Sequence, residues 1–199
     1  MKTQVKVITK QDQNVLENIF RLRYSVYVIE KGWAPDAGNL MEQDNYDEQA
    51  GYIAVLQKGE VPGVAEEVIA TARFISLQNK IMLDEEFHEL VAGVDLIREG
   101  AIEITRIAID NRFRHQHLDI QIYQKLVQWS IENNIQYWYF VVEKKYLRYL
   151  NRLGIKAVRI GKAKTFPDGV TAIAAYIDLK WVLEVLQSEN NQLYLKVVA

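Results

Sequence analysis

Cysteine is absent from the 199 residues, which excludes disulfide bonds, thiolate metal ligands and a cysteine nucleophile. No apolar run reaches the roughly 20 residues of a membrane-spanning helix, and the first residues lack the apolar core of a secretory signal. We therefore expect a cytoplasmic protein without stable membrane insertion. The three histidines have no partners at zinc-like spacing, and the aspartate pattern of calcium loops is missing. We expect no metal site, so oxygen and nitrogen groups must carry any chemistry.

The composition is that of a folded domain, with 49% hydrophobic and 25% charged residues. This length suits one substantial core, so we expect a single domain over residues 1–199. Charge is uneven, because residues 1–99 hold 10 Lys and Arg against 17 Asp and Glu, whereas residues 100–199 hold 14 against 9. An acidic partner for the second half is one explanation, and an ordinary solvated surface is the other. The negative net charge and the lack of a recognised motif argue against a nucleic-acid partner.

The spacing of apolar residues predicts alternating strands and helices. A strand at 102–109, a helix at 115–133 and a strand at 137–142 together predict a β-α-β crossover. This order of elements favours an α/β sandwich with helices on both faces of a mixed sheet. The other predicted strands are 5–8, 52–56, 68–75, 155–160 and 172–179, with a candidate edge strand at 192–198, and the other predicted helices are 13–28, 87–91, 144–152 and 181–186.

Four acidic residues, Glu42, Asp44, Asp47 and Glu48, follow a loop rich in glycine and proline and precede a predicted strand. A solvated acidic loop is the simplest interpretation. Alternatively, carboxylates held together favour a positive ligand such as a substrate ammonium group.

Charged residues also interrupt predicted strands. Arg73 lies in an apolar strand, where a buried permanent charge needs a carboxylate or phosphate partner. Glu103 and Arg106 lie in the strand expected at the sheet centre, where they form either a site or a buried ion pair. Their spacing puts them on opposite faces of a regular strand, but a β-bulge would change this and free backbone N–H groups that could stabilise an oxyanion.

Two segments are strongly cationic. Arg112 and Arg114 lie between a strand and a helix, where a phosphate could bind, although a cationic helix start is the simpler interpretation. Lys144, Arg148 and Arg152 recur every four residues on one helix face, with Lys145 beside them. This face is either solvated or a docking surface for an acidic protein or RNA.

The combination of charged and aromatic residues resembles a known family. The series Arg23, Tyr27, Trp33, Asp44, Asp47, Arg73, Glu103 and Arg106 is similar to the motifs of acyl-homoserine-lactone synthases, which have the GNAT fold and use acyl carrier protein and S-adenosylmethionine. The opening Arg23-Tyr24-x-Val26-Tyr27-x-x-Glu30-x-Gly32 is more similar to the related long-chain N-acyl amino acid synthases, which acylate a free amino acid such as tyrosine.

Three departures from these patterns guide the choice of product and donor. Tyr27 stands where lactone synthases usually have Phe, and the continuation of Arg73 lacks their Arg-Leu-x-Pro-Thr pattern; both features argue against a lactone product. The segment 112–117 lacks the glycines of acetyl-CoA-dependent GNAT enzymes.

The resemblance implies a GNAT-like α/β/α sandwich whose mixed sheet is splayed at the middle strands. It implies a bacterial acyltransferase that moves a fatty acyl group from acyl carrier protein to the amine of an amino acid, giving an N-acyl amino acid. The acyl-phosphopantetheine is a donor substrate, and no bound cofactor is expected. Alternatives are an acyl-homoserine-lactone synthase that uses S-adenosylmethionine, an acetyl-CoA-dependent acetyltransferase and a non-catalytic acyl-binding module.

The same resemblance assigns roles to individual residues. Glu103 would accept the proton of the amine, beside Arg106, and backbone N–H groups near Ile107 and Ile109 would hold the oxyanion and the phosphopantetheine arm. The expected substrate-binding residues are Arg23, Tyr27, Trp33, Asp44, Asp47 and Arg73 for the amine, and Ile104, Phe140 and Val142 for the acyl chain. The expected carrier-binding residues are Arg112, Arg114, Lys144, Lys145, Arg148 and Arg152.

Overall fold

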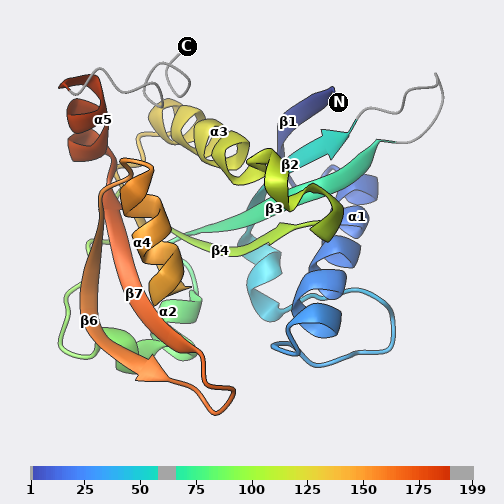
Figure 1. Ribbon diagram of the computed structural model, residues 1–199, viewed down its shortest axis with the longest axis horizontal. Helices are drawn as coiled ribbons and strands as arrows, with labels where there is room; N and C mark the ends of the chain where they lie inside the picture. Colours follow the sequence, from blue (N-terminus) through green and yellow to red (C-terminus); the bar gives the residue numbers. More distant parts are fainter. Residues whose placement is uncertain (1, 58–65, 189–199) are drawn as a thin grey trace. The chain divides into compact units, whose positions relative to one another are not determined.

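The computed structural model describes residues 2–57 and 66–188 (Figure 1). Its strands follow the order β1-β2-β3-β4-β5-β7-β6 in a mixed sheet. The strands are β1 (Thr3–Ile8), β2 (Gly51–Gln57), β3 (Glu67–Ser76), β4 (Ala101–Ile109), β5 (Tyr137–Glu143), β6 (Ala157–Thr165) and β7 (Thr171–Asp178). The helices are α1 (Gln13–Arg23), η1 (Tyr24–Glu30), η2 (Asn45–Gln49), α2 (Met82–Glu85), η3 (His88–Val91), η4 (Asn111–Gln116), α3 (Leu118–Glu132), α4 (Lys144–Arg152) and α5 (Leu179–Ser188).

The predicted elements are confirmed, with differences at their ends. The helix predicted at 144–152 has the observed bounds of α4. The helix predicted at 13–28 is α-helical only in α1 and continues as the π-helical turn η1. The spacing of apolar residues cannot reveal this change, because a π-helical turn shifts the backbone hydrogen bonds by one residue but changes the spacing of apolar side chains only slightly. The candidate strand at 192–198 lies outside the described residues.

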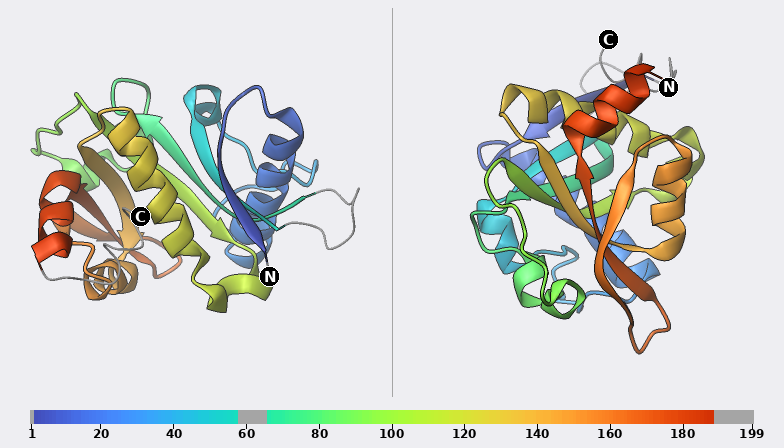
Figure 2. Two further views of the ribbon diagram at one scale, coloured as in Figure 1. Left: turned by 90° about the horizontal axis from the view of Figure 1, so that it is seen from above. Right: turned by 90° about the vertical axis from the view of Figure 1, so that its left-hand side faces the viewer.

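The chain groups into two compact units. Unit 1 comprises Met1–Phe74 and Arg106–Leu126. In it β1 pairs antiparallel with β2, and β2 pairs antiparallel with β3. Helix α1 packs on one face, where the ring of Phe20 meets the ring of Tyr52 edge-on at 6.0 Å, and the first part of α3 covers the other face (Figure 2).

Unit 2 comprises Ile75–Thr105 and Val127–Ala199. Strand β5 runs parallel to β4 over only three residue pairs, from Ala101↔Tyr137 to Glu103↔Tyr139, and then pairs antiparallel with β7. Helix α4 covers one face of β5-β7-β6, and α2 with η3 covers the other (Figures 1 and 2). The β-α-β crossover and the α/β/α sandwich with its splayed middle strands are therefore confirmed.

Strand β4 contains a one-residue bulge. The backbone N–H of Leu77 donates to the carbonyl of Ala101, and the N–H of Asp110 donates to the carbonyl of Ile69. Nine residue steps along β4 thus match eight steps along β3, and Arg106 between them has a φ of 50°. A left-handed non-glycine residue inside a strand is typical of such an irregularity. The bulge reverses the alternation of side chains, so the sequence spacing of Glu103 and Arg106 no longer places them on opposite faces of the sheet.

Candidate active site

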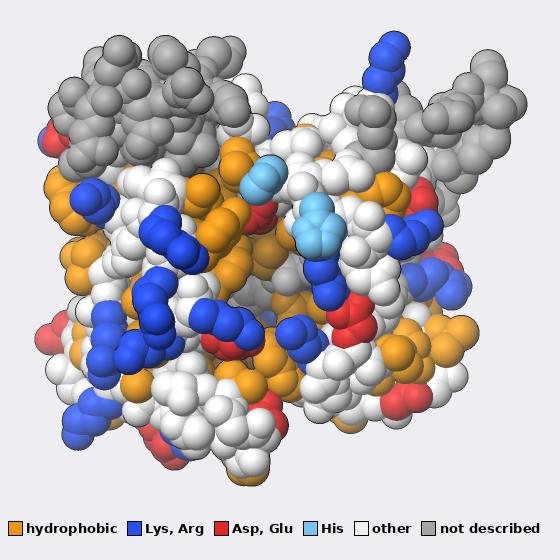
Figure 3. Space-filling view, in the orientation of Figure 1, with side chains coloured by type: hydrophobic (Ala, Val, Ile, Leu, Met, Phe, Trp, Pro, Cys, Tyr) orange, Lys and Arg blue, Asp and Glu red, His pale blue; other side chains and the backbone are white. Residues whose placement is uncertain are grey.

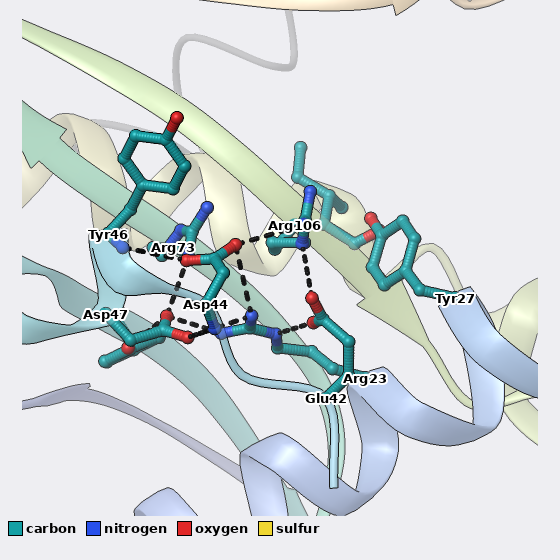
Figure 4. Close-up of polar contacts among 10 residues, drawn as sticks. Arg23, Tyr27, Glu42, Asp44, Tyr46, Asp47, Arg73 and Arg106 are labelled. Atoms are coloured by element: carbon teal, nitrogen blue, oxygen red, sulfur yellow. Dashed lines mark hydrogen bonds and ion pairs between the residues drawn. The ribbon is translucent and has the colours of Figure 1, made fainter. Parts of the chain in front are cut away.

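An ionic cluster lies in the interior of unit 1 and joins three guanidinium groups to three carboxylates (Figure 4). Its members come from segments that are distant in the sequence. They are Arg23 at the end of α1, Glu42 in the following loop, Asp44 and Asp47 at η2, Arg73 in β3 and Arg106 at the bulge of β4.

Two of the arginines are completely buried. Arg23 and Arg73 are each 0% exposed. Arg23 donates from Nε to Glu42 at 2.5 Å and from its two terminal nitrogens to Asp47 at 2.7 and 3.1 Å. One terminal nitrogen of Arg73 donates to Asp44 at 2.5 Å and to Asp47 at 2.8 Å. Such charges are retained in an interior only when they are paired, so these bonds explain why the strand tolerates Arg73.

Arg106 and Asp44 form the more accessible edge of the cluster. Arg106 donates from Nε to Glu42 at 3.0 Å and from a terminal nitrogen to Asp44 at 3.0 Å. The side chains of Arg106 and Asp44 are 18% and 19% exposed, against 4% for Glu42. A ligand that reaches the cluster would therefore meet one cation and one anion.

Local sequence explains how the two aspartates are placed. Asp44 caps η2 by accepting a bond from the N–H of Tyr46 at 3.0 Å, and the N–H of Asp44 donates to the carboxylate of Asp47 at 2.8 Å. This capping box satisfies free backbone donors at the helix start and turns both carboxylates toward the arginines. The Asp-x-x-Asp spacing is thus a folding signal as well as a source of charge.

The arginines keep the carboxylate of Asp47 ionised. Burial opposes ionisation of Asp47, but the charges and hydrogen bonds of Arg23 and Arg73 outweigh it and hold the pKa of this carboxyl well below its usual range. Burial and the neighbouring Asp47 raise the pKa of Tyr52, whose hydroxyl donates to Asp47 at 2.7 Å. With three cations and three anions the cluster is formally neutral, unlike the acidic pocket that Glu42, Asp44 and Asp47 alone would form.

Tyr27 and Trp33 lie beside the exposed edge of the cluster. The ring of Tyr27 lies under the guanidinium of Arg106 at 5.3 Å and 6.2 Å from the ring of Trp33. Trp33 remains 44% exposed. The hydroxyl of Tyr27 donates to the backbone carbonyl of Ile107 at 2.8 Å. The structure therefore brings together all six residues predicted to bind the amine, with Arg106 and Ile107 beside them.

Glu103 lies in the part of β4 that belongs to unit 2. It is 0% exposed, and its two oxygens accept bonds from the N–H groups of Met82 and Leu83, at 2.9 and 2.8 Å. These are N–H groups at the start of α2, so the carboxylate anchors this turn to β4. The anchoring role was not predicted from the sequence, because it depends on a turn about 20 residues away along the chain.

The residues predicted to line the acyl site belong to unit 2. Ile104 and Phe140 are 4% and 6% exposed, and Val142 is half-buried. A cleft of about 350 Å³ in the same unit is lined by other residues, namely Leu83, Asp84, His88, Val91, Val94, Asp95, Leu96 and Arg98. An acyl tunnel along Ile104, Phe140 and Val142 stays a prediction.

The predicted carrier-binding residues fall into two groups. Arg112 forms ion pairs with Glu67 and Asp110, and Arg114 forms one with Glu30. By contrast, Lys144, Arg148 and Arg152 of α4 are exposed, and no ion pair engages them within residues 2–57 and 66–188. Basic side chains gather over α4 in Figure 3, and residues 144–167 contain eight Lys and Arg but no Asp or Glu.

Two residues, Glu42 in the cluster and Tyr52 beside it, were not among the site residues that the family resemblance assigned. Glu42 was considered only as part of the acidic run that could bind a positive ligand, whereas it bridges Arg23 and Arg106. Tyr52 was predicted only as a strand residue. A signal for Tyr52 was present, because antiparallel pairing of β2 and β3 makes it the register partner of Arg73.

Comparison with known proteins identifies the family. The sequence profile described as autoinducer synthase matches residues 8–181. The chain belongs to the autoinducer synthase family. Members of this family transfer acyl groups, so the protein is an acyltransferase, as predicted.

Individual members of the family are similar over most of the chain. An acyl-homoserine-lactone synthase of Vibrio anguillarum is 25% identical over 81% of this chain and 85% of its own. The structure of a CoA-dependent acyl-homoserine lactone synthase, BjaI, solved with SAM and isopentyl-CoA, has a TM-score of 0.80 at 21% identity and covers 94% of this chain and 89% of its own. This likeness confirms the fold.

The N-acyl amino acid synthase FeeM from uncultured soil microbes is a weaker match. Its TM-score is 0.60 at 17% identity, with 98% of this chain and 99% of its own covered. The comparisons therefore support the lactone synthase alternative better than the N-acyl amino acid synthase that the opening motif favoured. Among the described residues, no helix is long and apolar enough to cross a membrane.

Proposed function

We propose that the protein is an acyl-homoserine-lactone synthase. The observation that carries the proposal is the cluster of Arg23, Glu42, Asp44, Asp47, Arg73 and Arg106 in a member of the autoinducer synthase family. The amine of S-adenosylmethionine attacks the thioester carbonyl, loses a proton and expels the donor thiol. The carboxylate of the acylated product then attacks its own γ-carbon, which closes the lactone and expels methylthioadenosine.

The exposed edge of the cluster suits the acceptor. Asp44 offers a carboxylate for the ammonium group of an α-amino acid, and Arg106 offers a guanidinium for its carboxylate. Trp33 and Tyr27 offer aromatic faces for the sulfonium and adenine groups of S-adenosylmethionine. A free amino acid shares the first two contacts but has no sulfonium group, so the exposed Trp33 favours S-adenosylmethionine.

Acyl transfer also needs a proton acceptor and donors for the oxyanion. We assign proton acceptance, directly or through water, to Glu103, because a carboxylate can act as a general base and Glu103 lies in β4, the strand that also carries Arg106. Backbone N–H groups near Ile107 and Ile109 would hold the oxyanion. The bulge at Arg106 supports this assignment, since bulges interrupt the regular ladder and redirect the backbone.

Acyl carrier protein is the donor that we favour. The acid-free stretch 144–167 and the exposed side chains of Arg148 and Arg152 suit an acidic protein partner. Coenzyme A is the second candidate, because the similar synthase BjaI was solved with an acyl-CoA.

The test is product analysis with purified protein. Wild-type protein is incubated with S-adenosylmethionine or tyrosine as acceptor, and with an acyl group on either carrier protein or coenzyme A; products are identified by mass spectrometry. We expect acyl-homoserine lactone, formed faster from the carrier. Acyl-tyrosine without lactone would overturn the proposal. Glu103→Gln should lower the rate by at least 10²-fold, whereas Glu99→Gln, at an exposed position nearby, should retain it.

A further inference from the structure

Tyr27 makes three kinds of contact with two other parts of unit 1, strand β4 and the loop that follows η1. Its hydroxyl donates to the carbonyl of Ile107 in β4 at 2.8 Å, and its ring lies under the guanidinium of Arg106 (Figure 4). Its own backbone carbonyl accepts bonds from the N–H groups of Trp33 at 2.8 Å and Ala34 at 3.2 Å. One residue thus connects β4 just after the bulge to the loop that carries Trp33.

The π-helical turn η1 leaves the backbone carbonyl of Tyr27 available to the Trp33 loop. In an α-helix the N–H of Lys31 would bond to the carbonyl of Tyr27, four residues earlier. Here the N–H of Lys31 bonds instead to Val26, five residues earlier, at 3.1 Å. The carbonyl of Tyr27 is thereby left to receive the Trp33 loop. Single π-helical turns occur often at functional sites, and this one gives Tyr27 both of its backbone partners.

The hydroxyl bond controls the direction of a peptide group in β4. A peptide unit is planar, so fixing the carbonyl of Ile107 also fixes the N–H of Ala108 on the other side of the bond. Arg106, the residue before Ile107, is left-handed with a φ of 50°, and a regular ladder does not continue through it. A side-chain bond from outside the strand therefore supplies the restraint at this point.

The hydroxyl remains a donor over the working pH range. Burial raises the pKa of Tyr27 to about 12, although the positive charge of Arg106 acts in the opposite direction. Phenylalanine, which lactone synthases usually have at this position, would fill the same space without the donor. The hydrogen bond is thus a property of this chain that the resemblance alone does not imply.

We propose that Tyr27 is a positioning residue, whose hydroxyl holds the backbone of β4 beyond the bulge in the orientation that binds the thioester carbonyl and couples it to the Trp33 loop. The inference rests on the proposed acyl transfer, because it assumes that this part of β4 contacts the donor. Tyr27 acts through the peptide of Ile107 rather than on the reacting atoms.

The experiment compares Tyr27→Phe with Tyr24→Phe. Tyr24 lies on the same π-helical turn, and its hydroxyl bonds to the exposed Asp36 at 3.1 Å, so the same atom is removed without affecting β4. We expect Tyr27→Phe to lower kcat for lactone formation about tenfold, equivalent to one lost hydrogen bond, and to change both KM values less than twofold. Tyr24→Phe should match the wild type.

Amide hydrogen exchange over residues 104–110 provides the second measurement. Tyr27→Phe should speed exchange in this segment several-fold and leave unit 2 strands β5 to β7 unchanged. A raised KM with normal kcat would mean that the hydroxyl of Tyr27 contacts substrate, and a loss of kcat without faster exchange would mean that the hydroxyl acts on the reacting atoms. Each result overturns the inference, as does wild-type behaviour. If the wild type makes no lactone, the proposed function fails, and exchange alone then decides whether the hydroxyl restrains β4.

Discussion

Arg23→Met removes one guanidinium from the buried cluster and keeps a side chain of similar length. Glu42 and Asp47 then lose a charge-assisted partner each, at 2.5 and 2.7 Å, in a region from which water is excluded. Removing one partner of a buried ion pair costs about 3–5 kcal/mol, because the remaining charge stays buried without compensation. We expect a loss of this size in the free energy of unfolding.

Thermal unfolding followed by circular dichroism tests this magnitude. For a chain of this length each kcal/mol shifts Tm by about 2–4 °C, so Tm should fall by about 6–20 °C. Arg21→Met is the control, because Arg21 lies two residues earlier on α1 in an exposed ion pair with Glu17 at 2.6 Å. An exposed pair of this kind contributes about 0.3–0.5 kcal/mol. Equal shifts for the two variants would refute the argument that the buried cluster stabilises the fold.

Three further predictions concern pH, a close packing contact and donor binding. The folded-state pKa of Asp47 lies below its unfolded value of about 3.9, so its contribution to stability is present above that pH and is lost as the pH falls toward the folded pKa. The urea midpoint should therefore fall less steeply between pH 7 and pH 2 for Asp47→Asn than for the wild type. Identical slopes would contradict this. In urea unfolding, Gly161→Ala should destabilise the protein far more than Gly169→Ala. Both glycines have a positive φ, but a Cβ at Gly161 would lie 1.8 Å from a backbone carbonyl oxygen of η3, whereas nothing lies within 4 Å of a Cβ at Gly169. Reversing the charge of Arg148 and Arg152 to Glu should raise KM for acyl carrier protein about tenfold and leave KM for S-adenosylmethionine unchanged; an unchanged KM for the carrier would remove α4 from the interface.

The order of elements could be predicted because it depends on local spacing of apolar residues. The crossover from β4 through α3 to β5 and the bounds of α4 followed from such patterns. The π-helical turn η1 could not, since its hydrogen bonds depend on how the following loop packs. From the sequence, a bulge in β4 could only be named as the feature that would change which faces Glu103 and Arg106 occupy. The backbone hydrogen bonds between β3 and β4 were needed to show that it exists.

The sequence by itself determined which residues carry charge in apolar surroundings, and therefore which residues need partners. Arg73 in a strand and the acidic run from Glu42 to Glu48 were visible without coordinates. Only the tertiary structure decided that these two groups satisfy one another, so that Asp44 and Asp47 are paired with Arg73, while Asp44 and Arg106 form the edge that a substrate can reach. The physical reason is that pairing energy depends on distance in space and on exclusion of water, and both are set by packing between segments far apart in the chain.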